Sequence, residues 1–184
     1  MPLQPGLIAL VAYNMRARDR DEMAALGLGL DSTRLAERLA LARYGFVACA
    51  DDSTPIAACA GEEHLPGLVG WSFFATAHLP EIGLALTRHL RRITIPTLCE
   101  AGVRRAEARS LKGYDWAARW MASLGFRDLC VLKRFGAGGQ DFILWELTDD
   151  DVRKSLLQPE ATQAARAGAA PTAADHRQRG GANG

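Results

Sequence analysis

The chain has 184 residues, 48% of them hydrophobic, so it can bury one sizeable core, and we expect a single domain with a short tail. Its 22 basic and 21 acidic residues give a net charge of +1, which removes the broad attraction that nonspecific nucleic-acid binding needs, so nucleic acid is not indicated as a partner. The four cysteines lie far apart without a C-x-x-C pair, which argues against a zinc site or a disulfide framework and predicts small buried residues in a reducing compartment.

The chain begins with a short apolar helix, which we expect over residues 7–14. Its apolar run, 7–12, has no basic segment before it and no cleavage signature after it, and it is too short to cross a bilayer. We therefore expect no membrane association and a soluble protein of intracellular origin.

Two more helices are expected before the first strand. Asp19 can cap the second helix, with Glu22 three residues later in the pattern of a capping box. Asp31 or Ser32 can cap the third, which we expect to run to Tyr44.

The rest of the chain alternates between strand and helix patterns in the order three strands, helix, strand, helix, two strands. The expected elements are a hairpin of 46–50 with 56–60, a strand at 71–76, a helix at 80–92, a strand at 105–109, a helix at 114–124, and a closing hairpin of 130–135 with 142–147. Gly125 is expected in a left-handed conformation at the end of its helix. We expect Trp120, Leu124, Phe126 and Phe142 to pack together.

A last helix is expected to start at 149 and to stop before Pro159. Residues 160–184 contain no large apolar side chain, so they cannot offset the entropy of ordering themselves. We therefore expect a folded domain over 1–158 and a low-complexity tail over 159–184 that is disordered unless a partner holds it.

Three segments together resemble the C-terminal half of a GNAT acetyltransferase: 106–109, the helix that ends at 120–126, and the hairpin that ends at 140–145. This resemblance implies an α+β fold of three α/β/α layers, with a mixed, mostly antiparallel sheet flanked by helices. The Pro-rich start leaves little room for the first strand, which we expect to be short or missing.

A narrower resemblance is to the GNAT-related family typified by a T7-like phage internal virion protein. It rests on Met15 and Arg16 with Asp19 and Glu22, on the strand around 70–76, and on 120–126, and it covers about residues 10–147.

The GNAT resemblance implies a loop of the form Q/R-x-x-G-x-G/A, whose N–H groups hold the CoA pyrophosphate at a helix start. Gly83 and Ala85 fit this pattern and are the vestigial cofactor-binding residues that we predict. Pro80 stands in place of the leading cation and has no N–H, and Glu81 places an acid where the anion should bind. We therefore expect no cofactor, with acetyl-CoA as the alternative.

Many enzymes of this superfamily use a tyrosine of the penultimate helix to protonate the departing thiolate. Met121 occupies that position and cannot donate a proton, and Tyr114, about two turns away, is expected at a different depth of the cleft. We therefore assign no catalytic residue.

Other polar and aromatic residues are more readily explained as surface or packing groups than as sites, and no metal ligand set is expected. These are the acids Glu100 and Glu107, the histidines His64, His78 and His89, the arginines Arg88, Arg91 and Arg92, the pair Trp116 and Trp120, and the cysteines Cys99 and Cys130.

The narrower resemblance, together with the departures from the acetyl-CoA site, implies a non-enzymatic phage virion or assembly protein with a degenerate acetyl-CoA site. It would bind other phage structural proteins through the tail, whose arginines (Arg166, Arg177, Arg179) lie among small residues, and it would reside in the host cytoplasm and then in the virion. The alternative is an acyl-CoA-dependent N-acetyltransferase acting on an unknown amine, and a phage-encoded effector directed at the host is a third possibility.

Overall fold

The computed structural model describes residues 1–28 and 31–157. Residues Met1–Val152 form one compact unit, and a second unit begins at Arg153. The predicted domain boundary after residue 158 and the predicted tail, 159–184, lie outside the described residues.

Three helices precede the first strand: α1 (Pro5–Tyr13), α2 (Ala17–Ala25) and α3 (Ser32–Ala40). Asp31 is the cap of α3, because its Oδ1 accepts hydrogen bonds from the backbone N–H groups of Thr33 (3.0 Å) and Arg34 (3.2 Å). The predicted extension of this helix to Tyr44 was wrong, since Tyr44 already begins a strand.

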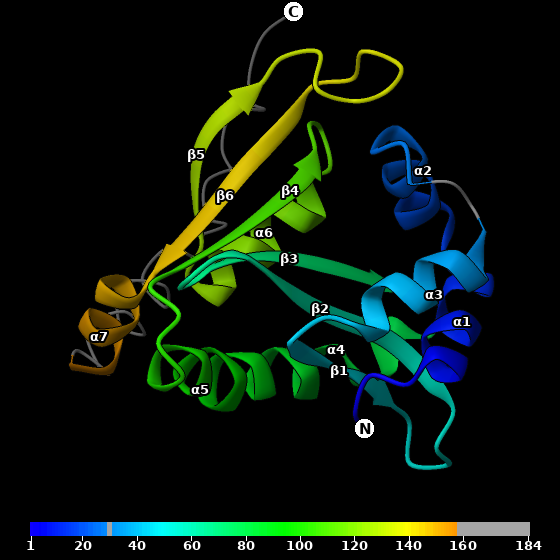
Figure 1. Ribbon diagram of the computed structural model, residues 1–184, viewed down its shortest axis with the longest axis horizontal. Coiled ribbons are helices and arrows are strands. Elements are labelled where there is room, and N and C mark those ends of the chain that lie inside the picture. The colour runs from blue at the N-terminus through cyan, green and yellow to red at the C-terminus, as the bar shows by residue number, and fades with distance from the viewer. Residues whose placement is uncertain (29–30, 158–184) are drawn as a thin grey trace, which may run out of the picture. The chain divides into compact units, whose positions relative to one another are not determined.

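Within the described residues, six strands form one mixed sheet in the order β1-β2-β3-β4-β6-β5 (Figure 1). The strands are β1 (Tyr44–Cys49), β2 (Pro55–Leu65), β3 (Leu68–Ala75), β4 (Arg105–Leu111), β5 (Arg127–Leu132) and β6 (Phe142–Thr148). Neighbouring strands are antiparallel except for β3 and β4, which are parallel. The predicted strand order along the chain is confirmed, and no full strand precedes α1 in the described part of the chain.

The later helices are α4 (Leu79–His89), the π-helical turn η1 (Leu90–Thr94), α5 (Ile95–Glu100), α6 (Asp115–Leu124) and α7 (Asp149–Leu157). The helical segment predicted to end at Arg92 continues to Glu100. Leu90, Ile95 and Leu98 are buried, so core packing carries the helix past Pro96. Gly125 ends α6 with φ 99°, as expected for a left-handed cap.

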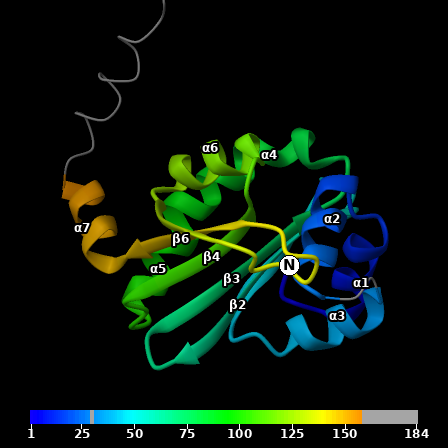
Figure 2. The same ribbon diagram turned by 90° about the horizontal axis from the view of Figure 1, so that it is seen from above.

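Helices cover both faces of the sheet, which gives the three expected layers (Figure 2). One cluster of buried side chains packs the helices α4, α5 and α6 on one face of the sheet and includes Leu86, Met121, Leu124 and Trp145. A second cluster joins α1 to α3 to the other face around Ile8, Val47 and Phe74.

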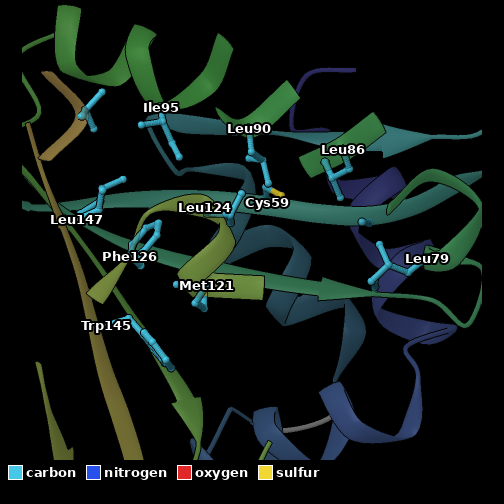
Figure 3. Close-up of a cluster of buried hydrophobic side chains, with 14 of the residues drawn as sticks. Cys59, Leu79, Leu86, Leu90, Ile95, Met121, Leu124, Phe126, Trp145 and Leu147 are labelled. Atoms are coloured by element: carbon cyan, nitrogen blue, oxygen red, sulfur yellow. The ribbon is translucent and has the colours of Figure 1, made fainter. Parts of the chain in front are cut away.

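The core around α6 differs from the expected one in a single residue. Leu124 and Phe126 are buried together with Trp145 and Leu147 (Figure 3). Trp120 is partly buried and packs against this cluster. Phe142 is fully buried but does not belong to this cluster. Alternate residues of a strand face opposite sides, so Trp145 and Leu147 point toward α6 and Phe142 points away.

Candidate functional site

The strands β3 and β4 diverge from one another at the centre of the sheet (Figure 1). They are paired only from Leu68 with Arg105 to Trp71 with Ala108, although β3 continues to Ala75 and β4 to Leu111. The backbone of Ala75 faces the gap between the strands, because its N–H bonds to α2 across that edge. By the twofold alternation of a strand, the backbone N–H and C=O of Phe73 face the gap as well and can bind a ligand there.

The helix α2 lies across the wide end of this gap and contacts both strands. Asp19 Oδ2 accepts a hydrogen bond from the Ala75 N–H of β3 at 2.8 Å, and Glu22 Oε2 accepts one from the Leu111 N–H of β4 at 3.0 Å. Residues three apart lie on the same helix face, so both carboxylates reach the sheet together. The predicted capping role of Asp19 was therefore wrong: Arg16 is the N-cap residue of α2, and the Asp19 side chain bonds to the strand instead.

Asp19 is buried and paired with Arg16, whose Nε lies 2.8 Å from Asp19 Oδ2. Burial raises the pKa of the Asp19 carboxyl, and its hydrogen bond and charge interaction with Arg16 oppose that rise. The Arg16 guanidinium also lies over the Trp116 ring, 4.8 Å from its centroid. The start of α2 is thus fixed to β3 and to α6 by the same pair of charges.

Glu22 is the carboxyl group best suited to proton transfer at neutral pH. Desolvation by burial raises its pKa to about 7, the hydrogen bond from Leu111 and the charge of Arg16 lower it, and the charge of Asp19 raises it. A carboxyl with this pKa exchanges protons readily near neutrality, which is the property of a general acid or base.

A cavity of about 90 Å³ opens from the gap toward α6. Aromatic side chains line much of it: Trp116 is stacked on Trp120 with centroids 5.6 Å apart, and Phe73 lies 4.5 Å from Trp120. Tyr114 and Met121 line the same cavity, and the different depth expected for Tyr114 stays a prediction. Burial chiefly raises the pKa of Tyr114, which keeps its hydroxyl protonated.

A second hollow, of about 240 Å³, reaches the gap from the side of α2 and α3. Glu22 and Arg109 line both this hollow and the cavity near α6. Groups that enter from opposite faces of the sheet can therefore meet beside these two side chains.

The predicted cofactor residues lie inside α4 and not in a loop before it. The helix starts at Leu79, so the N–H of Gly83 belongs to the helical hydrogen-bond pattern, and Ala85 is exposed. In the first turn, Pro80 has no N–H, and the Glu81 N–H donates to the His78 carbonyl at 3.0 Å. The Glu81 carboxylate lies 2.7 Å from His78 Nδ1. This helix start offers few free donors to an anion.

Trp116 and Trp120 line the cavity near α6 and His64 lines the second hollow, while the remaining singled-out residues lie outside the site. Glu107 is paired with Arg105 at 2.8 Å, Glu100 and His64 are exposed, and His89 packs its ring edge on Phe46. Arg88, Arg91 and Arg92 are all exposed. Cys130 is exposed, which corrects its expected burial, because it lies on the edge strand β5. In the described part of the chain, no cluster of potential ligands could hold a metal ion, and no helix is long and apolar enough to cross a membrane.

Sequence reasoning did not identify Arg109 or the reach of Glu22 to β4. Glu22 and Leu111 are 89 positions apart, so no local pattern joins them. The spacing Arg16, Asp19, Glu22 was visible, but it fits a helix cap equally well.

A scan against protein-family models found no match, and a search of curated proteins found none either. The fold is similar to several solved acetyltransferases. A ribosomal-protein-alanine N-acetyltransferase from Brucella melitensis has a TM-score of 0.60 at 18% identity, with 78% of this chain and 93% of that chain covered. A GNAT-family acetyltransferase from Bacillus anthracis has a TM-score of 0.60 at 14% identity, covering 78% and 89%. A phosphinothricin acetyltransferase from Sinorhizobium meliloti, in complex with acetyl-CoA, has a TM-score of 0.53 at 17% identity, covering 64% and 69%.

These similarities give no support to the narrower relationship with phage internal virion proteins. They agree with the observed topology, in which a mixed sheet opens between its two parallel strands and is flanked by helices. This chain has the fold of the GNAT acetyltransferases.

Proposed function

We propose that this chain is an N-acyltransferase that acylates a small amine in the gap between β3 and β4. The observation that carries the proposal is the position of Glu22: it lines the hollows on both faces of the sheet, and its pKa is raised to about 7. An amine entering beside α2 would reach Glu22 at the place where an acyl group can enter from the α6 side.

The reaction forms a bond between the amine nitrogen and the acyl carbon and breaks the bond from that carbon to the leaving group, which departs with the electron pair. The amine must lose a proton, and Glu22, whose pKa lies near the working pH, accepts it. Tyr114 lines the cavity with its hydroxyl protonated, so it can supply a proton to the leaving group. The backbone N–H of Phe73 faces the gap and can bind the acyl oxygen.

Acyl-CoA is the donor that the fold suggests, but the start of α4 does not fit its diphosphate. Pro80 offers no N–H, Glu81 donates its own to His78, and the Glu81 carboxylate would repel an anion. We therefore assign no step to CoA itself, and we propose that the donor is recognised mainly by its acyl end.

A second candidate is a GNAT-fold domain without enzymatic activity. The same helix start and the presence of Met121 in place of a proton donor favour it. A virion location and contacts with phage structural proteins through residues 159–184 remain predictions, since that segment lies outside the described residues.

The test is acyl transfer by the full chain, with product amide measured by mass spectrometry. Acetyl-CoA at millimolar concentration and the acetyl thioester of N-acetylcysteamine serve as donors, with a panel of small amines as acceptors. We expect Glu22→Gln to lower kcat/KM by about 100-fold, in the range of a lost general base. Glu37→Gln changes an exposed glutamate of α3 and should leave the rate unchanged. If the wild-type chain yields no amide with either donor, the second candidate replaces this proposal.

A further inference from the structure

We propose that the amine acceptor is an α-amino acid with a free carboxylate and an apolar side chain, bound in the hollow beside α2 with its carboxylate on Arg109 and its ammonium group on Glu22. This inference rests on the proposed function, and it names the acceptor class of the same site.

Arg109 has hydrogen-bond donors to spare. Its Nε is buried and has no hydrogen-bond partner among the described residues. The acidic oxygen paired with it, Glu107 Oε2, is 3.6 Å from Nη2, whereas Arg105 holds Glu107 Oε1 at 2.8 Å. A guanidinium presents parallel N–H groups that match a carboxylate, and the Arg109 side chain is 34% exposed, so a carboxylate in the hollow would bind the exposed part of the guanidinium.

Glu22 of α2 supplies the opposite charge, because its side chain reaches β4 close to Arg109. It accepts the N–H of Leu111, two residues after Arg109, and such residues lie about 7 Å apart on one edge of a strand. Glu22 and Arg109 line the same hollow, yet the described residues show no ion pair between them. The Glu22 carboxyl and the Arg109 guanidinium, which has a 3.6 Å contact with Glu107, therefore match the ammonium and carboxylate groups of one zwitterion.

The rest of the hollow favours an apolar side chain. Met23 of α2 lines it together with Leu26 and Leu28, which follow that helix. Phe135 also lines it, and the Cζ atom of Arg109 lies over the Phe135 ring, 5.7 Å from its centroid. The other polar side chains of the hollow are His64, Ser72 and the pair Arg38 and Glu62, in which Arg38 donates to both carboxylate oxygens at 3.1 Å and 2.9 Å. Burying a Leu-sized side chain here would also cover Phe135, which is 47% exposed.

The first arm of the test compares three acceptors that share a side chain. L-Leucine carries both charges, L-leucinamide lacks the carboxylate, and isopentylamine lacks the whole carboxyl group. We expect kcat/KM for leucine to exceed that for either analogue by at least about tenfold, which corresponds to about 1.4 kcal/mol. Arg109→Gln should lower kcat/KM for leucine much more than for leucinamide, so that the preference for leucine is lost. Arg91→Gln, at an exposed arginine of η1, is the matched control and should change neither.

The second arm measures binding of leucine and leucinamide to the full chain by calorimetry, without any donor. We expect leucine to bind wild-type protein and the Arg91→Gln control at least tenfold more tightly than it binds Arg109→Gln. Leucine binding that depends on Arg109 without acylation would support the amino-acid binding site and overturn both the proposed function and the role of leucine as an acceptor. Equal acylation of all three acceptors, or equal leucine affinity in wild type and Arg109→Gln, would overturn the inference, and equal acylation would leave the proposed function standing. Arg109→Lys keeps the charge but not the forked donors; it should retain part of the preference if Arg109→Gln fails to fold.

Discussion

Asp19 and Glu22 stand one turn apart on α2 and accept backbone hydrogen bonds from opposite sides of the central gap, Asp19 from Ala75 and Glu22 from Leu111. Through these two bonds a short helix bridges the diverging ends of the two parallel strands. Asp19 is neutralised by Arg16, whereas Glu22 is not bound to a cation at ion-pair distance in the described residues and so is free for the proton transfer that we propose.

Asp19→Ala should destabilise the fold by about 3 kcal/mol, because it leaves the Arg16 charge and the Ala75 N–H without their partner in a buried place. Urea denaturation followed by circular dichroism measures the change. Asp21→Ala, at an exposed position of the same helix, should shift the midpoint little. Equal midpoints for Asp19→Ala and wild type would show that the contact with β3 contributes nothing.

The Glu22 carboxyl should make stability depend on pH. Its pKa is about 7 in the fold against an ordinary value of 4.5, so its favourable contribution is complete below pH 4.5 and is lost as the pH rises through 7. Arg16, Asp19 and Tyr114 surround it, and Arg109 lines the same cavity. The unfolding free energy of Glu22→Gln, measured relative to wild type, should therefore rise by on the order of 2 kcal/mol from pH 5 to pH 8. This figure is reduced because Glu22 is partly exposed to solvent. Urea titrations of both proteins at the two pH values test this, and a constant difference would contradict the raised pKa.

Trp120→Ala should cost about 3 kcal/mol of unfolding free energy. The ring packs on Phe73 and Trp116, and its Nε1 donates to Thr87 Oγ1 at 3.0 Å, which ties α6 to α4. Trp116 is 39% exposed, so Trp116→Ala should cost clearly less. Thermal unfolding of the two variants side by side distinguishes a packed helix face from an exposed one.

Ser110→Ala should cost about 1 to 2 kcal/mol, because it removes the acceptor of the buried Trp145 Nε1, which donates to Ser110 Oγ at 2.8 Å. Combining it with Trp145→Phe removes both partners, so the cost of the serine change should shrink in that background. Purely additive denaturation energies would show that the hydrogen bond is without effect.

Acetyl-CoA should bind no more tightly than about the millimolar range, worth about 4 kcal/mol. The cause is the first turn of α4, where Pro80 and Glu81 offer no free amide to a diphosphate. Calorimetric titration checks this directly. Micromolar binding of CoA that is lost on removal of its nucleotide half would mean that this helix start does hold the diphosphate.

The sequence was sufficient for the element order, the layers and several local features, because these depend on periodicity and caps. Asp31 and Gly125 stand where helix ends require them, and their roles were predictable from neighbouring residues alone. The helix through Pro96 was not predictable in the same way, since burial of Ile95 and Leu98 overrides the local preference of proline.

The candidate site was predicted less well than the fold, because its geometry comes from residues far apart in the chain. Gly83 and Ala85 match the residue types of the loop pattern, but α4 starts four residues before Gly83, so the glycine lies inside the helix. Arg109 looks like one of several charged residues on a strand; only the folded arrangement shows that its Nε lacks a partner.

In a paired sheet the spacing between neighbouring strands is fixed at about 4.8 Å by main-chain hydrogen bonds. Across the wide end of this gap, two side chains of one helical turn replace that ladder, with Asp19 reaching β3 and Glu22 reaching β4. The lengths of these two side chains therefore set the width of the opening. Exchanging a glutamate for an aspartate on α2 would alter it by about one carbon–carbon bond, roughly 1.5 Å, without touching either strand.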